Sequence, residues 1–415
     1  MATSIVLNFF LLCLLLFSAS PTLSASNELP KTGFITLPVK KDPATNQYYT
    51  SIGIGTPNHK LNLAIDLAGE FLWYDCDTRY NSSSYLPVPC DTQKCPQNSP
   101  CIGCNGFPTK PGCTNNTCGL SITNPFADTI FSGDMGEDLL HIPQIKVPRS
   151  FASGCADSDR FSTPLLVGLA KGTKGILGLA RSQLSLPTQI SSSYNVPPKF
   201  TLCLPSSNTK GTGKIFIGGR PSSRANVARI GFALTSSEEY FINVKSIMVD
   251  DKVVNFDTSL LSLDKNGNGG TKISTLGTPY TVLHNSIYKP FVRDFVKKAS
   301  DRKIKRVKSV APFEACFDAG SIDDLDMGPA VPVIELLFDG GLKYEMFGHN
   351  TMVEVKEKVL CLAFVDGGKK AKNAVVLGGR QLEDKILEFD LSTSILTFSS
   401  SLLLQGETCS DPVLN

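Results

Sequence analysis

Short runs of apolar and β-branched residues, separated by glycines and prolines, fill most of the 415-residue chain. Such runs between turn-forming residues are typical of β-strands. Apolar residues recur at helical spacing only at Ser286–Val296, and a shorter helix is predicted at Ser185–Ile190. The pattern therefore predicts a mainly β protein with a few short helices.

Two stretches of the chain share one outline, an apolar strand that ends at a polar residue before a glycine turn. The first is Leu61–Trp73, which contains Asp66, and the second is Thr271–Tyr280, which contains Ser274 at the matching place. Each is followed about a hundred residues later by an apolar run that ends in glycine. These two runs are Gly175–Leu179 and Ala374–Gly379. A repeat of this size indicates two similar halves.

This doubled pattern resembles the pepsin-like aspartic peptidases, and the resemblance runs from Tyr48–Pro57 to Glu388–Leu391. It implies a mainly β, bilobed, pepsin-like acid-protease fold with two pseudo-symmetric lobes. Those peptidases use two aspartates, one from each half, that share a proton. Two carboxylates that close cannot both ionise, so one acts as a base on water and the other as an acid.

Three departures from the family pattern argue against peptidase activity. Ser274 stands where the second aspartate is expected, and a hydroxyl cannot share that proton. Leu67 and Ala68 replace the Thr-Gly that should follow Asp66, and the flap segment Ser121–Ala127 has no tyrosine. We therefore interpret Asp66 and Ser274 as remnants of a catalytic pair, with no functional catalytic residue. Residual aspartic-type endopeptidase activity remains the enzymatic alternative.

The first 25 residues have the features of a signal peptide. Met1–Phe17 is apolar and lacks charged side chains, and small residues follow as far as Ala25. An apolar core of about thirteen residues is too short to span a membrane. We expect a secreted protein, extracellular or in the cell wall, with no membrane span. The predicted divisions are a signal peptide (1–25), an N-terminal lobe (26–225) with a cysteine-rich insert (76–118), and a C-terminal lobe (226–415).

The net charge of +2, from 40 Lys and Arg against 38 Asp and Glu, gives no electrostatic case for nucleic acid as a partner. A local exception is the basic run Lys297–Lys308, which is either a site for pectin or another polyanion or the solvated end of a helix. Asp264–Gly269 resembles the start of a calcium loop, but Thr275 occupies the position where a glutamate must bind. We expect a hairpin turn there, no metal and no cofactor.

Twelve cysteines remain after Cys13 is removed with the signal peptide, and an even number in an oxidising compartment predicts disulfides. Seven of them lie in the insert, where Cys101–Cys104 also has the spacing of half a zinc site. The twelve are Cys76, Cys90, Cys95, Cys101, Cys104, Cys113, Cys118, Cys155, Cys203, Cys316, Cys361 and Cys409. The resemblance implies the pairs Cys316–Cys361 and Cys203–Cys409.

Two glycosylation sequons begin at Asn81 and Asn115, both within the cysteine-rich insert. A secreted protein with sequons in a loop is expected to carry glycan on at least one of them.

Four further segments narrow the resemblance to a secreted plant subgroup, the xylanase and glucanase inhibitors, dermal glycoproteins and basic 7S globulins. These segments are Phe71–Cys76, Gly175–Ala180, Ser309–Cys316 and Gly378–Asp384. The subgroup implies a binding protein of plant defence, most simply an inhibitor of microbial cell-wall glycoside hydrolases. The alternative is a storage or peptide-ligand-binding role of the basic 7S globulin type.

The resemblance also implies which surface would meet a hydrolase. In glucanase-blocking members, arginines from two places reach the carboxylates of the enzyme cleft. The matching places here carry Asp326 and Glu407, so we expect no inhibition of xyloglucan-type endoglucanases in that way. Arg380 is the nearest cation that we nominate as a partner contact. Its alternative role is an ion pair with Glu383 or Asp384.

Overall fold

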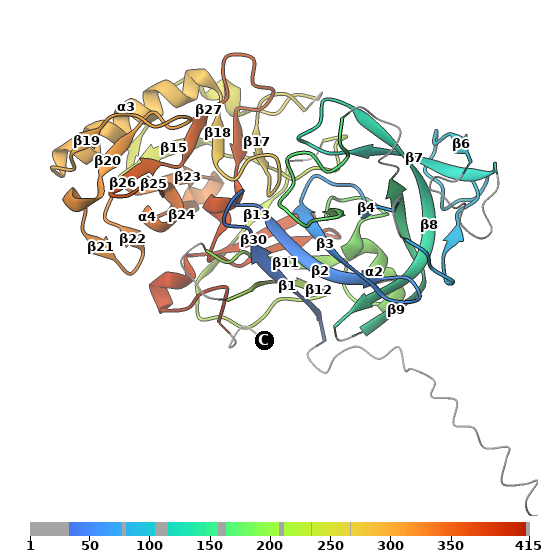
Figure 1. Cartoon of the computed structure of the whole chain (residues 1–415). Coiled ribbons are helices and arrows are strands. Elements are labelled where there is room, and N and C mark those ends of the chain that lie inside the picture. The colour runs from blue at the N-terminus through green and yellow to red at the C-terminus, as the bar shows by residue number, and fades with distance from the viewer. Residues whose placement is uncertain are drawn as a thin grey trace, which may run out of the picture.

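We describe the chain from a computed structural model (Figure 1). The described residues are 33–76, 80–103, 115–143, 145–156, 163–206, 211–233, 235–265 and 267–411, without the side chains of 146–150. The predicted signal peptide lies outside this range. Strands dominate, and Figure 1 shows a lobe with β6 to β9 on the right and a lobe with α3 and β19 to β27 on the left.

The largest sheet among the described residues has 15 strands and runs through the middle of the molecule. Its order is β13-β30-β29-β11-β12-β1-β2-β3-β10-β4-β9-β8-β7-β6, with β5 paired to β8. The strands are β1 (Ile35–Lys41), β2 (Tyr48–Ile54), β3 (His59–Asp66), β4 (Trp73–Asp75), β5 (Leu86–Pro87), β6 (Cys101–Ile102), β7 (Thr117–Thr123), β8 (Ile130–Ile142), β9 (Ile145–Ala156), β10 (Gly175–Gly178), β11 (Lys199–Cys203), β12 (Gly213–Ile217), β13 (Val227–Gly231), β29 (Leu387–Asp390) and β30 (Ile395–Ser399). Its C-terminal strands β29 and β30 return to pair with β11 and β13, so both ends of the chain contribute to it.

Smaller sheets form the rest of the C-terminal half. The first contains β14 (Phe241–Ile242), β17 (Thr271–Ile273), β28 (Val375–Leu377), β18 (Thr281–Leu283) and β27 (Phe364–Asp366). The second contains β16 (Lys252–Val253), β15 (Ser246–Val249), β23 (Ile334–Leu337) and β24 (Lys343–Met346). The third contains β19 (Arg306–Val307), β20 (Cys316–Asp318), β26 (Val359–Leu362) and β25 (Met352–Lys356), and a hairpin joins β21 (Asp324–Leu325) to β22 (Gly328–Pro329).

Both predicted helices form, and both end later in the chain than predicted. α2 is Leu186–Tyr194 and α3 is Asn285–Asp301. α3 begins where the His284 ring accepts a hydrogen bond from the Ser286 N–H, and it buries residues such as Phe291 and Phe295 on one face. The other short helices are α4 (Gly348–Thr351), η1 (Thr258–Leu261), η2 (Ala319–Ser321), η3 (Asp339–Gly341), η4 (Gly379–Leu382) and η5 (Leu402–Gln405). Within the described ranges no helix is long and apolar enough to cross a membrane.

Each half contains the same three-strand arrangement. In the first half β10 lies between β3, to which it is parallel, and β4, to which it is antiparallel. In the second half β28 lies between β17 and β18 with the same two orientations. Glycine is required at the last residue of β10 and directly after β28. A Cβ on Gly178 would lie 2.4 Å from the Gly69 oxygen, and one on Gly378 would lie 2.4 Å from the Tyr280 carbonyl carbon. The repeated sequence pattern thus encodes two copies of one strand arrangement.

Apolar packing and several charged contacts join the two halves. The main core cluster contains buried residues from Ile35 through Phe398, including the stacked rings of Phe200 and Phe389. At the edge of this core, the Lys41 ammonium pairs with Glu383, which is fully buried and also accepts a hydrogen bond from the Tyr48 hydroxyl at 2.7 Å. A buried charge is tolerated only where a partner neutralises it.

Five disulfides lie in the part of the chain that the structure describes. They are Cys76–Cys155, Cys90–Cys101, Cys95–Cys118, Cys203–Cys409 and Cys316–Cys361. The two pairs implied by the family resemblance are both present. Cys104 and Cys113 lie outside the described residues. Cys101 is bonded to Cys90, so it is not available to the half zinc site that its spacing to Cys104 suggested.

Candidate functional site

Asp66 and Ser274 occupy equivalent places at the ends of β3 and β17. Asp66 lies opposite Gly178 in the parallel pairing of β3 with β10. β17 pairs with β28 up to Ile273 opposite Leu377, so Ser274 is the next residue and faces Gly378. Both side chains are buried, with 7% of Asp66 and 5% of Ser274 exposed.

A threonine hydroxyl connects the two turns across the lobe junction. Thr275 Oγ1 accepts a hydrogen bond from the Leu67 N–H at 3.2 Å and donates one to the Ile65 carbonyl at 2.8 Å. If the two turns were related by two-fold symmetry, a hydroxyl of the first turn would make the same pair of hydrogen bonds to the second turn. The equivalent residue in the first turn is Leu67, which is fully buried and has no hydroxyl, so only half of the contact exists.

Asp66 is a single buried carboxyl group in this site. Its Oδ1 accepts a hydrogen bond from the Ala68 N–H at 2.9 Å. Burial raises the pKa of Asp66, while the Ala68 N–H and the nearby Lys272 ammonium act in the opposite direction. Lys272 forms an ion pair with Glu239, whose charge also raises this pKa.

In the second turn, the Ser274 hydroxyl bonds within the turn itself, and the Leu276 side chain packs into the first lobe. The Ser274 hydroxyl donates a hydrogen bond to the Leu276 carbonyl at 2.6 Å, so its proton is already engaged. The Leu276 side chain is only 4% exposed and belongs to the apolar cluster of the first lobe, with Ile122 of β7 and Phe71. A leucine therefore fills space beside the remnant pair.

The hairpin of β7 and β8 is fastened at its tip. The Asn124 side chain, which is buried, donates to the carbonyls of Leu165 and Val167 at 2.8 and 2.9 Å. Its neighbour Pro125 reaches the second turn, where a Cβ on Gly277 would lie 3.7 Å from it. The hairpin is thus held to one lobe and touches the other, and its segment Ser121–Ala127 brings no tyrosine.

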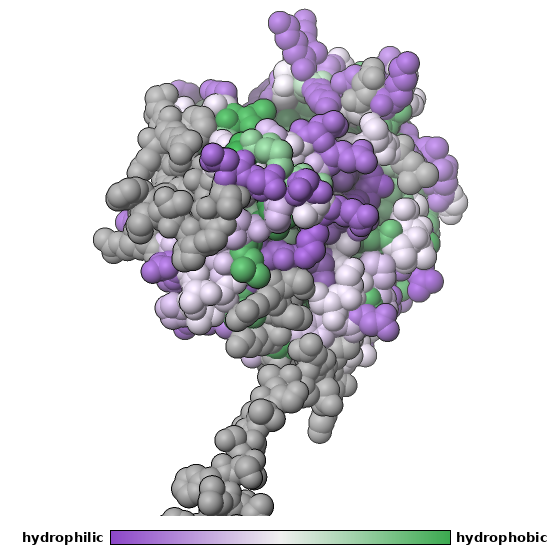
Figure 2. Space-filling model, turned by 90° about the vertical axis from the view of Figure 1, so that its right-hand side faces the viewer, coloured by the Kyte–Doolittle hydropathy of each residue, from purple (hydrophilic) through white to green (hydrophobic). Residues whose placement is uncertain are grey.

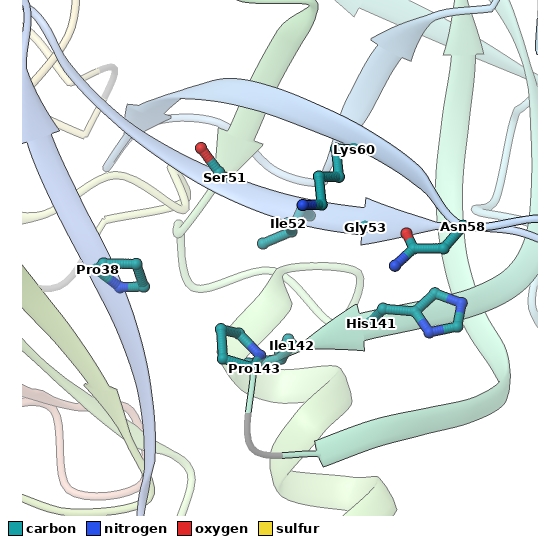
Figure 3. A pocket seen from close by; sticks show the side chains of 9 residues that line it. All are labelled: Pro38, Ser51, Ile52, Gly53, Asn58, Lys60, His141, Ile142 and Pro143. Carbon is teal, nitrogen blue, oxygen red and sulfur yellow. The ribbon is translucent and has the colours of Figure 1, made fainter.

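The two cavities that we describe are lined mainly by residues of the first lobe. The first encloses about 540 Å³ and has Glu70 and Phe71 in its lining, together with Glu238 from the second half of the chain. Burial and, less strongly, the charge of Glu70 raise the pKa of Glu238. The second encloses about 370 Å³, and Figure 3 shows Lys60 and His141 among the side chains that surround it. Asp66 and Ser274 line neither.

The partner contacts that the sequence suggests, Arg380, Asp326 and Glu407, occupy three different settings. Arg380 is partly buried in η4, and its Nε donates a hydrogen bond to the Met352 carbonyl at 2.9 Å. Asp326 is exposed at the turn between β21 and β22. Glu407 is 14% exposed and accepts a hydrogen bond from Arg224 Nε at 2.8 Å.

Arg224 is therefore a surface cation that the sequence pattern did not reveal. Its side chain is 74% exposed, and it lies beside Glu407 although 183 residues separate the two in the chain. Only the folded arrangement brings the two together, so the sequence around Glu407 gave no sign of its arginine neighbour.

The remaining candidate residues lie at the surface or in turns. Asn81 and Asn115 are both exposed, as glycosylation would require. Asp264 accepts hydrogen bonds from the backbone and side chain of Asn268 at 2.9 Å, the pattern of a turn. Among the described residues, no group of three or more His, Cys, Asp or Glu side chains is placed to hold a metal ion.

Figure 2 shows the face of the first lobe in which hydrophilic and hydrophobic residues are interspersed. Exposed apolar side chains on β5 and β8 include Leu86 and Ile130, at 51% and 62% exposure. Scattered exposed apolar residues of this kind are normal on a soluble surface.

Comparisons with known proteins cover both halves of the chain. A family model described as "Xylanase inhibitor N-terminal" matches residues 48–219, and one described as "Xylanase inhibitor C-terminal" matches residues 239–400. A protein of Nicotiana benthamiana named "Probable aspartic proteinase GIP2" is 42% identical, and the match covers 99% of this chain and 98% of that protein. "Basic 7S globulin" of Glycine max is 32% identical, with 98% of each chain covered.

Solved structures of the same fold are also similar. The crystal structure of a protein called edgp is 39% identical, with a TM-score of 0.84 over 91% of this chain and 97% of that chain. The crystal structure of basic 7S globulin from soybean is 32% identical, with a TM-score of 0.79 over 92% of this chain and all of that chain. These similarities extend over both lobes and support the pepsin-like bilobed arrangement.

Proposed function

This chain belongs to the xylanase inhibitor family of pepsin-like proteins, and from that premise we propose that it is a secreted binding protein without peptidase activity. The observation that carries the proposal is the state of the remnant site. Asp66 is its one carboxyl group, the Ser274 hydroxyl is bonded to the Leu276 carbonyl, and Leu276 packs beside the pair. Hydrolysis by this fold needs a base and an acid that share a proton, and Ser274 supplies neither.

The partner that we propose is a microbial glycoside hydrolase of the kind that degrades cell walls. Both halves match a family described by xylanase inhibition, which supports this class of partner. A hydrolase cleft contains two carboxyl groups, and an inhibitor gains affinity when it presents a cation to them. Arginine suits this role because its planar guanidinium donates two parallel hydrogen bonds to one carboxylate.

Arg224 is better placed for this contact than Arg380. The Nε of each arginine is already bonded, that of Arg224 to Glu407 and that of Arg380 to the Met352 carbonyl. They differ in exposure, because the Arg224 side chain is 74% exposed whereas Arg380 is partly buried. We therefore assign the cation at the proposed interface to Arg224. Asp326, exposed on the β21–β22 turn, would repel an enzyme carboxylate, and this supports our expectation that xyloglucan-type endoglucanases are not inhibited.

The test is a titration of purified xylanases and endoglucanases with the intact protein. We expect inhibition of at least one xylanase, and we expect Arg224→Ala to weaken it by roughly ten- to a hundredfold if a desolvated ion pair is lost. Arg229→Ala is the matched control, because Arg229 is an exposed arginine of the neighbouring strand β13. Inhibition that is equally weakened by both substitutions would contradict the assignment of Arg224.

The xyloglucan-type endoglucanases provide a second arm of the same experiment. The wild-type protein should leave them active, and Asp326→Arg should introduce inhibition if repulsion by Asp326 is the cause. Tight inhibition by the wild type would refute this part of the proposal. Failure to inhibit any hydrolase in the panel would refute the partner class.

A peptide-ligand-binding role is the second candidate, and the larger of the two cavities favours it. This cavity of about 540 Å³ presents Glu70 and Glu238 together with the apolar Phe71 and Leu184. Such a lining suits a peptide with basic and apolar side chains. Calorimetric titration with basic peptides would detect binding, and Glu70→Gln should weaken it, whereas inhibition of hydrolases should not change.

A further inference from the structure

A strongly basic surface lies at the end of the C-terminal lobe, on the opposite side of the molecule from β7 and β8 (Figure 1). Seven of the twelve residues 297–308 are Lys or Arg, against a single acid, Asp301. The segment contains the last turn of α3, its C-cap Arg302 and the edge strand β19. We call residues 297–308 the basic surface. It is far more basic than the chain as a whole, whose net charge is +2.

The backbone of the basic surface is held in place. Ile304 is 6% exposed and anchors the segment in the main core cluster. The Lys305 N–H donates to the Ser321 hydroxyl, and the Lys305 carbonyl accepts from the Asp318 N–H, both at 2.9 Å. β19 then pairs with β20, which carries Cys316 of a disulfide. A ligand that bound here would therefore lose little free energy to ordering the backbone.

Three lysines of this segment present unpaired ammonium groups. Lys303, Lys305 and Lys308 are exposed, and none of the three ammonium groups makes a hydrogen bond or ion pair with any described residue. Three positive charges at this end of the lobe are thus left to solvent or to a partner.

The two arginines of the segment are already engaged. Arg302 pairs with Asp250 at 2.7 Å, and Arg306 donates to the Glu314 carbonyl at 3.4 Å. The available cations are therefore lysines, which are flexible and strongly hydrated point charges without the planar geometry that grips one phosphate or carboxylate. The segment also lacks aromatic residues, on which the bases of single-stranded nucleic acids stack.

We propose that the basic surface binds a polyuronate, a linear polysaccharide that carries one carboxylate on each sugar. Regularly repeated carboxylates match a row of lysines on a fixed backbone, because each sugar offers the same charge and no single contact must be precise. The proposed site shares no residue with the proposed hydrolase contacts, because it does not include Arg224, Asp326 or the remnant pair.

The experiment is affinity electrophoresis of the folded protein through gels that contain sodium polygalacturonate. We expect retardation at about 50 mM salt that disappears by about 300 mM, because salt screens exposed charges. Fully methyl-esterified polygalacturonate is the matched ligand control, since it keeps the sugar backbone and removes the charge. It should cause no retardation.

The variant Lys303→Gln, Lys305→Gln, Lys308→Gln should weaken binding to polygalacturonate roughly tenfold, because exposed ion pairs are weak individually and act together. Lys60→Gln, Lys171→Gln, Lys174→Gln is the matched control, because it removes the same charge from exposed lysines of the other lobe. It should bind as the wild type does. Cations near a helix C-terminus or on an edge strand also favour folding, so thermal unfolding of both variants is measured alongside.

Three results would overturn the proposal. One is the absence of binding by the wild type at low salt, and another is equal weakening in the two triple variants, which would mean that only total charge matters. The third is tighter binding of duplex DNA or of anionic phospholipid vesicles than of polygalacturonate through the same lysines, which would assign the surface to a different partner.

Discussion

At the scale of single residues, Asp66 provides the main evidence on whether the site can hydrolyse peptides. Its carboxyl group is buried and its pKa is raised, chiefly by burial. An isolated carboxyl group in such a place costs stability once it ionises, because the folded state favours the neutral form. In a peptidase, a second carboxyl group would share the proton, whereas here Ser274 directs its hydroxyl to Leu276.

We predict that Asp66→Asn increases thermal stability near pH 7. The amide keeps an acceptor for the Ala68 N–H and removes the buried charge. Because the folded pKa of Asp66 lies above its unfolded value of about 4, the stability contributed by this carboxyl falls as the pH rises through that interval. The gain should therefore shrink towards zero below the unfolded value. Unfolding curves across pH measure it, with the exposed Asp326→Asn as control, and an equal gain at about pH 3 would contradict the account.

The cysteine pairing leads to a second prediction at this scale. Ten of the twelve form five disulfides in the described chain, which leaves Cys104 and Cys113. We predict that these two pair with each other, because an unpaired thiol in an oxidising compartment is rare. Peptide mapping without reduction should recover that link, and a free thiol at either position would show the prediction to be wrong.

At the scale of elements, the second turn and the β7–β8 hairpin contact each other across the lobe junction. Leu276 is 4% exposed inside the apolar cluster of the first lobe, and the hairpin tip is fastened by Asn124. We predict that Leu276→Ala costs about 2–5 kcal/mol, as expected for a large-to-small change in a core. Chemical denaturation measures this cost. Leu342→Ala, at a residue that is 36% exposed, should cost much less, and similar costs for the two would contradict the burial of Leu276.

Elements were also the scale at which the sequence was most informative. The doubled pattern around Asp66 and Ser274 predicted two equivalent strand arrangements, because buried parallel strands and close-packed glycines leave little freedom of sequence. The hydrogen bonds of Thr275 to Ile65 and Leu67 could not be predicted from the sequence. Thr275 lies 210 residues from Ile65 and 208 residues from Leu67 in the chain, so these bonds depend on how the two turns are placed in the fold. The pairing of Arg224 with Glu407 escaped prediction for the same reason.

At the scale of the whole molecule, the two lobes behave as one unit because they share a sheet, a core and a buried charge pair. Lys41 near the N-terminus of the first lobe neutralises Glu383, which is fully buried. We predict that Lys41→Met destabilises the protein by about 3–5 kcal/mol, because it leaves that carboxylate buried without its partner. Lys40→Met is the control, since Lys40 is the adjacent, exposed lysine.

Calorimetric unfolding measures both variants. The wild type should unfold in one transition, and Lys41→Met should unfold at a lower temperature or in two steps. If Lys40→Met had as large an effect as Lys41→Met, or if neither substitution changed the unfolding temperature, the charge pair would not hold the lobes together.

The most direct test of the central claim, that this pepsin-like protein binds without cleaving, is a digestion assay on denatured casein at about pH 4 with and without pepstatin. At that pH a working pair of aspartates would share one proton. We predict no pepstatin-sensitive cleavage by the wild type, and none by Ser274→Asp, because Leu67, Leu276 and the flap segment are unchanged in that variant. Cleavage by the pure wild-type protein that pepstatin abolishes, and that Asp66→Asn also abolishes, would contradict the account.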